Sequence, residues 1–151
     1  MSSHAAIRML YCAASMLLAP CVLSNTPASG STLWPVENGR VVAEFAGRHR
    51  GIDIAAPAGT AVRAFASGVV ASRDTSRHCG EHLSIRHPDG SSTLYCNLAD
   101  ISVALGDTVK PGSSLGRIAS APDGRKSHLH FELKLGDEKV DPLEHLPRTP
   151  E

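Results

Sequence analysis

The segment His128-Leu129-His130-Phe131-Glu132-Leu133-Lys134-Leu135 alternates polar and apolar residues without interruption. Successive side chains of a β-strand point to opposite faces, so this pattern predicts a half-buried strand. The residues expected to face the core are Leu129, Phe131, Leu133 and Leu135. On the other face, His128 and His130 would lie about 6.5 Å apart along the strand, with Glu132 beyond them. That distance could be spanned by one metal ion and one reacting water, although an ordinary amphipathic strand has the same pattern.

Short apolar runs bounded by Gly, Pro or Asp predict further strands along the chain. These runs cover residues 51–54, 62–65, 68–71, 83–87, 93–96 and 114–118. After Pro35 the sequence has no helical period lasting three turns, although residues 98–103 could form one helical turn. A Gly-x-x-Val pattern recurs at 59–62 and 106–109, which suits a folded-over sheet. We therefore expect an all-β fold, a compact β-sandwich of antiparallel strands (duplicated hybrid or barrel-sandwich type) with little helix.

Composition limits the size of the protein and its classes of partner. The 151 residues include 15 Lys and Arg against 15 Asp and Glu, so one domain without net charge is expected. Binding to nucleic acid normally needs clustered basic residues, and this sequence has no such cluster. Hydrophobic residues make up 42% of the chain, enough for a packed core.

The N-terminal segment has the pattern of a secretory signal. Residues 9–23 are almost purely apolar, follow Arg8 and contain Pro20. This run of about 15 residues is shorter than the roughly 20 that a membrane-spanning helix needs. Cleavage near residues 26–28 is the expectation, and lipid attachment at Cys21 and an uncleaved anchor are the alternatives. We expect a periplasmic or extracellular protein with no stable membrane span after cleavage.

The expected organisation follows from these limits. It comprises a signal peptide (1–28), a linker (29–39), one domain (40–146) and a polar tail (147–151). Removal of the signal peptide would leave two cysteines, Cys79 and Cys96, which flank a predicted hairpin whose turn is residues 87–90. In the oxidising compartment that export implies, these two cysteines are expected to form a disulfide. A disulfide there would add about 3 kcal/mol of stability in the chain-entropy model. Two buried thiols are the alternative.

A second group of possible metal ligands lies earlier in the chain. His49 and Asp53 supply an imidazole and a carboxylate, both suited to zinc, four positions apart. In a fully extended chain their ends would be about 13 Å apart, too far to share one ion. The chain must therefore bend between them, and Gly51 is where a bend is least restricted. Alone, the spacing also fits a surface histidine beside a capping aspartate.

Together these motifs resemble the lysostaphin and LytM-type zinc peptidases, enzymes that cut peptide cross-links of bacterial peptidoglycan. The resemblance covers about residues 41–146. It rests on motifs in the family's order: 49–60, 68–70, 85–90 with 93–95, 103–116, 128–132 and 141–142. It implies that His49, Asp53 and His130 bind Zn²⁺ and that His128 is a catalytic histidine beside the metal. Three protein ligands and one open position are typical of hydrolytic zinc sites.

Two positions depart from the family pattern. The family continues Tyr-x-His-Leu, whereas this chain has Asn97 where the second catalytic histidine is expected. An amide can donate a hydrogen bond to a developing oxyanion but cannot relay a proton near neutral pH. The loop before His128, residues 119–127, also lacks the family's Gly- and Thr-rich character, which leaves one wall of the substrate groove undetermined.

The remaining histidines carry weaker signals. His78 and His82 could form a second metal cluster with Cys79, but a loop closed by a disulfide is the preferred interpretation. His87, beside the hairpin turn, is expected to make a structural hydrogen bond.

Three functions remain open from the sequence. The first is a secreted zinc endopeptidase with peptidoglycan peptides as substrate, attenuated by Asn97. The second is a non-catalytic, zinc-containing module of the same fold that binds cell wall or regulates a partner hydrolase. The third, a lipoyl- or biotinyl-carrier domain suggested by residues 103–116, lacks a lysine at a hairpin tip between apolar neighbours.

Overall fold

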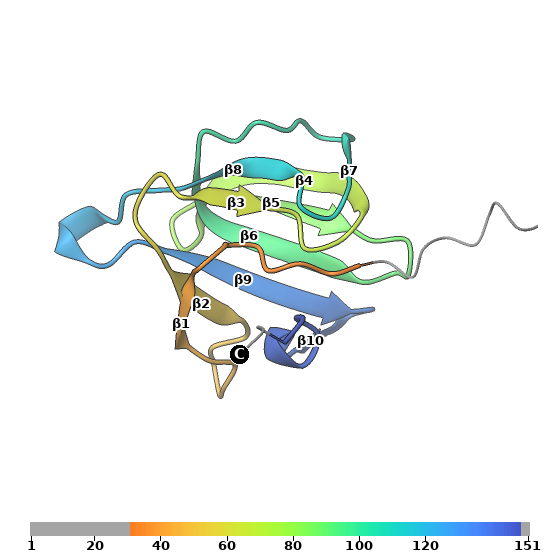
Figure 1. The fold of residues 1–151 in the computed structure, drawn as a ribbon, viewed down its shortest axis with the longest axis horizontal. Coiled ribbons are helices and arrows are strands. Elements are labelled where there is room, and N and C mark those ends of the chain that lie inside the picture. Colours follow the sequence, from red (N-terminus) through yellow and green to blue (C-terminus); the bar gives the residue numbers. More distant parts are fainter. Residues whose placement is uncertain (1–30, 149–151) are drawn as a thin grey trace, which may run out of the picture. The chain divides into compact units, whose positions relative to one another are not determined.

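The computed structural model describes residues 31–148, and these form a nearly all-β unit (Figure 1). The predicted signal peptide and the possible lipid site at Cys21 lie outside the described residues. Within that range, none of the helices has the length and apolar character to cross a membrane. The strands are β1 Arg40–Ala43, β2 Ile52–Ala55, β3 Ala61–Arg63, β4 Gly68–Ser76, β5 Gly80–Arg86, β6 Ser92–Ala99, β7 Thr108–Val109, β8 Ser114–Ile118, β9 His128–Leu135 and β10 Glu138–Val140. Two short 3₁₀ helices, η1 Pro122–Gly124 and η2 Pro142–Glu144, complete the elements.

The strands pair antiparallel in the order β1-β2-β9-β6-β5-β4-β7. β10 pairs with β9, while β3 pairs with β8, which joins the main path through the end of β6. Side chains of the β3–β8 pair, Val62 and Leu115, belong to the same buried cluster as Ile85, Tyr95 and Phe131 of the main path. One core thus lies between two β layers, and the expected antiparallel β-sandwich is confirmed.

Periodicity located the central strands well. β8 and β9 have the predicted bounds, and Leu129, Phe131 and Leu133 are buried in the core. Leu135 is an exception, because it is 42% exposed at the end of β9, where the chain turns towards β10. The two Gly-x-x-Val segments lead into β3 and β7, with Gly59 and Gly106 at φ values of 86° and 87°.

Two local expectations were wrong. Residues 98–103 do not form a helical turn: β6 continues to Ala99, and Asp100 then has a φ of 50°. Residues 33–36 of the expected linker pack on the domain, because Leu33 N–H donates to Phe65 O at 2.9 Å and Val36 is 1% exposed. The apolar side chains of this segment gain burial that a solvated linker would lack.

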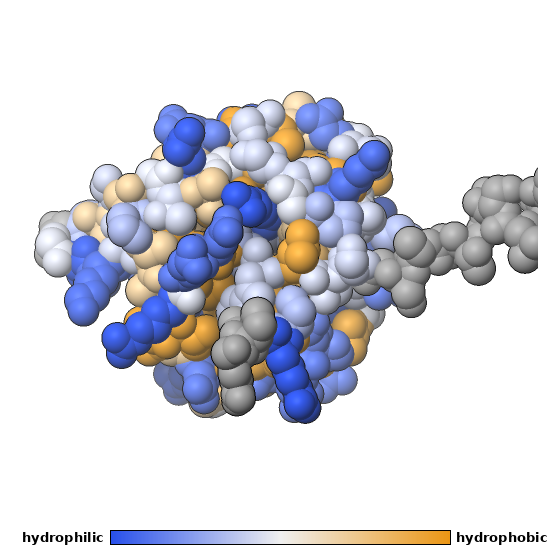
Figure 2. Space-filling model, in the orientation of Figure 1, coloured by the Kyte–Doolittle hydropathy of each residue, from blue (hydrophilic) through white to orange (hydrophobic). Residues whose placement is uncertain are grey.

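The exposed apolar side chains of the described residues come from separate elements. They are Leu33, Val42, Val69, Leu105 and Leu135. On the face drawn in Figure 2, apolar residues form small groups among polar ones. This face therefore offers polar rather than broad apolar contact to a partner.

Candidate metal centre and adjoining pocket

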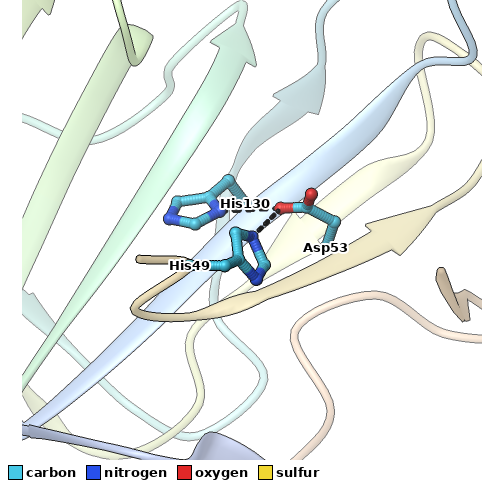
Figure 3. A group of neighbouring side chains, drawn as sticks. All are labelled: His49, Asp53 and His130. Atoms are coloured by element: carbon cyan, nitrogen blue, oxygen red, sulfur yellow. Dashed lines mark hydrogen bonds and ion pairs between the residues drawn. The ribbon is translucent and has the colours of Figure 1, made fainter. Parts of the chain in front are cut away.

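The antiparallel register of β2 and β9 brings two predicted metal ligands together. Asp53 is directly opposite His130, although 77 positions separate them. Asp53 Oδ1 lies 2.7 Å from His130 Nδ1 and 3.1 Å from His49 Nε2 (Figure 3). One ligand atom from each of the three residues lies within 4.8 Å of the others. The distant segments thus converge as the family resemblance implied.

His49 is directed into this group by its local backbone. Its Nδ1–H donates to Glu44 O at 2.8 Å, which leaves Nε2 facing Asp53. The chain bends at Gly51, as predicted. The structure adds a second reason for glycine there, because a Cβ at Gly51 would lie 2.5 Å from Phe131 O. Close approach of β2 to β9 therefore requires a residue without a side chain.

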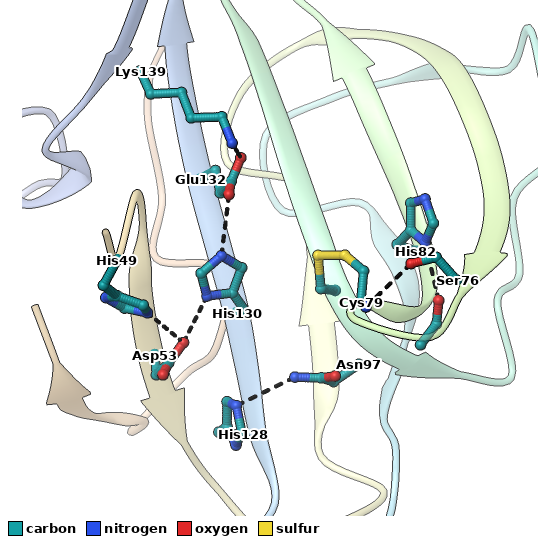
Figure 4. The surroundings of a disulfide bond; sticks show 12 residues. His49, Asp53, Ser76, Cys79, His82, Asn97, His128, His130, Glu132 and Lys139 are labelled. Atoms are coloured by element: carbon teal, nitrogen blue, oxygen red, sulfur yellow. Dashed lines mark hydrogen bonds and ion pairs between the residues drawn. A yellow bond between two sulfur atoms is a disulfide. The ribbon is translucent and has the colours of Figure 1, made fainter. Parts of the chain in front are cut away.

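Glu132 and Lys139 extend the group behind His130 (Figure 4). Glu132 Oε1 lies 3.2 Å from His130 Nε2, and Glu132 Oε2 lies 2.7 Å from Lys139 Nζ. A carboxylate that holds the second nitrogen of a histidine fixes the ring orientation and raises its basicity. The alternation of residues 128–135 predicts that Glu132 shares a face with His130 but does not indicate a role for it. Lys139 could not be found in that way, because its position depends on the β9–β10 hairpin.

The charges of this group stabilise one another. Burial acts to lower the pKa of His130, but hydrogen bonds to Asp53 and Glu132 outweigh it and raise the pKa to about 9. Burial acts to raise the pKa of Asp53, yet hydrogen bonds from His130 and His49 bring it below its usual value. The pKa of Glu132 is likewise lowered: burial opposes ionisation, and the contacts with His130 and Lys139 favour it.

The donor set fits a zinc ion. Two imidazole nitrogens and one carboxylate oxygen are a common zinc ligand set, and three protein ligands leave a position for substrate or water. The side chains of His49, Asp53 and His130 are 30%, 22% and 21% exposed, so solvent reaches the group. This is the only group of at least three potential metal ligands found among residues 31–148.

His128 and Asn97 form a second polar pair beside this group (Figure 4). His128 Nδ1–H donates to Lys126 O at 3.1 Å, and Asn97 Nδ2 lies 3.3 Å from His128 Nε2. The Asn97 amide can therefore donate to the free nitrogen of a neutral imidazole. Asn97 has a φ of 65°, a left-handed conformation that asparagine accepts more readily than most residues. The two predicted catalytic positions are thus adjacent, and both lie in the same pocket.

The predicted cysteine pair adjoins Asn97. The sulfur atoms of Cys79 and Cys96 are at bonding distance, with Cα atoms 5.0 Å apart (Figure 4). Asn97 N–H also donates to Cys79 O at 2.8 Å. The 77–79 loop is consequently attached to the strand that carries Asn97 by a backbone hydrogen bond and through the two sulfur atoms.

His87 and His82 make hydrogen bonds away from the candidate metal centre. His87 is 5% exposed, and its ring nitrogens lie 2.7 Å from Ser67 O and 2.9 Å from Thr93 Oγ1, which confirms the expected structural hydrogen bond. His82 Nδ1 lies 2.9 Å from Gly80 O.

A pocket of about 380 Å³ adjoins the His128–Asn97 pair. Its walls come from residues 77–81, from Asn97 and Leu98 of β6, and from the 119–125 loop. The loop that departs from the family pattern therefore forms one wall of this pocket. The pocket borders His128 and excludes the three candidate metal ligands from its lining.

Comparisons with known proteins identify the family of the chain. The sequence pattern described as Peptidase family M23 matches residues 47–142. The chain is 39% identical over 103 residues to the DD-carboxypeptidase/endopeptidase Mpg of Neisseria meningitidis, covering 68% of this chain and 24% of that protein. It is 31% identical over 143 residues to the murein hydrolase activator NlpD of Salmonella dublin, covering 86% and 37%.

A solved structure agrees. The structure of a zinc-containing peptidase from Vibrio cholerae superposes with a TM-score of 0.67 at 26% identity, covering 74% of this chain and 39% of that one. The chain spans less than half the length of each of these three proteins. The matched residues lie within the predicted 40–146 domain and contain every proposed site residue. The chain therefore belongs to Peptidase family M23.

Proposed function

We propose that this chain is a zinc-dependent endopeptidase of peptidoglycan peptides, slowed by Asn97. The convergence of His49, Asp53 and His130 on one point carries the proposal. Degenerate metal sites lose ligands, whereas this chain retains an imidazole–carboxylate–imidazole set with Glu132 supporting His130. When bound, zinc supplies Lewis-acid polarisation of a carbonyl and lowers the pKa of a water.

His128 is the group that moves a proton. Its Nδ1–H is held by Lys126 O, so Nε2 is the nitrogen able to accept a proton from a water and return it to the leaving amine. Asn97 donates to that same nitrogen at 3.3 Å. This contact orients His128 and competes with the proton that Nε2 must accept. Asn97 could instead donate to the developing oxyanion when a substrate displaces it.

Digestion of purified peptidoglycan tests this proposal. The zinc-loaded full-length chain should release new amino groups, activity should disappear with a chelator, and zinc should restore it. His128→Ala should abolish turnover while zinc content stays unchanged. A matched control is His145→Ala, since His145 is exposed and lies outside the group. Zinc-loaded, folded protein without any turnover would contradict the enzymatic role.

The regulatory alternative has one specific observation in its favour. Asn97 removes a proton relay, and the matched NlpD is named as a murein hydrolase activator. Under this alternative, the zinc-loaded chain would leave peptidoglycan intact and accelerate a separate hydrolase.

Lipoprotein relatives such as the NlpD/LppB homologue of Pseudomonas aeruginosa, which is 34% identical over 126 residues, agree with an exported location. We propose a periplasmic or extracellular site of action in both cases.

A further inference from the structure

The pocket beside His128 and Asn97 carries a charge pattern that zinc hydrolysis does not require. Two of its lining side chains, Arg77 and Arg125, are exposed guanidinium groups. Glu81 is the single carboxylate among the residues that line it. The pocket is therefore more basic than the chain as a whole, which has no net charge.

Both arginines are available to a ligand. Among the side chains that the structure describes, which leave out that of Asp123, neither guanidinium takes part in an ion pair. Other arginines are engaged: Arg73 and Arg117 each donate a hydrogen bond to a backbone carbonyl, and Arg63 pairs with Glu37. Arg77 and Arg125 thus retain their donors for a group that enters the pocket.

The Arg77 side of the pocket is held in place next to the proposed proton-transfer pair. Arg77 belongs to the loop joining β4 and β5, two residues before Cys79. The hydrogen bond from Asn97 N–H to Cys79 O and the sulfur contact to Cys96 fix this loop to β6. A fixed loop lowers the entropy that a ligand loses on binding.

The Arg125 side is closed by short contacts of its own loop. Ala121 N–H donates to Ser127 Oγ at 3.2 Å, and Arg125 N–H donates to Pro122 O at 3.4 Å. These contacts bring the 121–127 segment back towards His128 at the start of β9. Two guanidinium groups from segments far apart in sequence therefore line one pocket at the same polar pair.

We propose that Arg77 and Arg125 bind a carboxylate of an acidic peptide and so place the neighbouring peptide bond beside His128. The guanidinium fork matches carboxylate geometry and forms charge-assisted hydrogen bonds that a neutral amide cannot replace. The inference rests on the proposed peptidase function, since it adds the substrate class to that site. It assigns substrate selection to residues 77 and 125 and leaves the zinc ligands and His128 their own roles.

A binding comparison tests the assignment without needing turnover. The probes are a capped tetrapeptide with one glutamate and the same peptide with glutamine in its place, titrated into the zinc-loaded full-length chain by calorimetry or NMR. We expect the glutamate peptide to bind about tenfold more tightly. Arg77→Gln and Arg125→Gln should each reduce that preference about threefold, and the double variant should abolish it. Raised ionic strength should weaken the preference as well.

Arg86→Gln is the matched control, because Arg86 is exposed at the opposite end of β5 and lines a different pocket. It should keep the full preference, and all variants should keep their zinc content and thermal midpoint. The proposal is overturned if the unmodified chain binds both peptides equally or binds neither, or if the double variant still prefers glutamate. If the unmodified chain bound no zinc, or hydrolysed no peptidoglycan when loaded with zinc, that result would contradict the peptidase function instead. The two results can be told apart, because peptide preference is measured separately from hydrolysis.

Discussion

Exchanging Asn97 for histidine should increase the rate of peptidoglycan hydrolysis. The Asn97 amide lies 3.3 Å from His128 Nε2, at a position from which a second imidazole could exchange protons with a reacting group in the pocket. An amide cannot do so near neutral pH. A well-placed general acid or base contributes about 10²–10⁴-fold in rate, which is about 3–5 kcal/mol of barrier. We expect a gain within this range.

The backbone at position 97 should tolerate the change. Its φ of 65° is a region where asparagine and histidine are both enriched among non-glycine residues. The adjoining pocket of about 380 Å³ leaves room for the larger ring. The backbone contacts of Asn97, to Cys79 O and from Ala119 N–H, do not involve the side chain. The free energy of unfolding should change by about 1 kcal/mol or less.

The assay counts new amino groups released from purified peptidoglycan by zinc-loaded protein, with zinc content and thermal midpoint recorded for each variant. Asn97→Gln is the matched control, because it lengthens the side chain but keeps an amide. If folded, zinc-loaded Asn97→His gains no activity, or if Asn97→Gln gains as much, the amide at position 97 does not limit the rate.

Three further changes test the supports of the site and the core. Glu132→Gln should weaken zinc affinity by about 10–100-fold, because a neutral amide holds the second nitrogen of its histidine partner less strongly; competition with a fluorescent chelator measures this, and unchanged affinity would exclude the supporting role. Tyr95→Phe should lower the free energy of unfolding by about 1–3 kcal/mol, since Phe65 N–H donates to the buried Tyr95 hydroxyl at 2.9 Å and would lose its acceptor; denaturant titration checks it, with a stability equal to wild type as the contrary result. Changing Cys79 and Cys96 together to serine should lower the free energy of unfolding by about 3 kcal/mol. Denaturant titration with and without a reducing agent measures this, and a difference between wild type and variant that the reducing agent leaves unchanged would show that no disulfide contributes.

Local patterns predicted the centre of the sheet and missed its edges. The alternation in residues 128–135 and the turn-bounded run at 114–118 gave the bounds of β9 and β8, because side-chain period and flanking turns are local properties. β1, β7 and β10 have four, two and three residues, too few for a period to show. The packing of Val36 and the exposure of Leu135 depend on which elements lie nearby, and no local pattern specifies that.

The sequence indicated the three residues that converge in the candidate site, but not the residues that support them. His49, Asp53 and His130 were proposed as ligands from spacing and family resemblance. The β2–β9 register places Asp53 opposite His130, and the bend before β2 brings His49 to them. Lys139 reaches Glu132 only because β10 folds back on β9. The pocket beside His128 combines three segments separated by many residues, so its basic character emerges only from the folded chain.

Zinc stoichiometry under competition with a chelator tests most directly whether three distant side chains hold one ion. We expect the full-length chain to bind one zinc ion, and His49→Ala, Asp53→Ala and His130→Ala each to lose tight binding while His145→Ala retains it. Tight binding of one zinc ion by a variant lacking all three ligands would place the ion elsewhere and contradict the account.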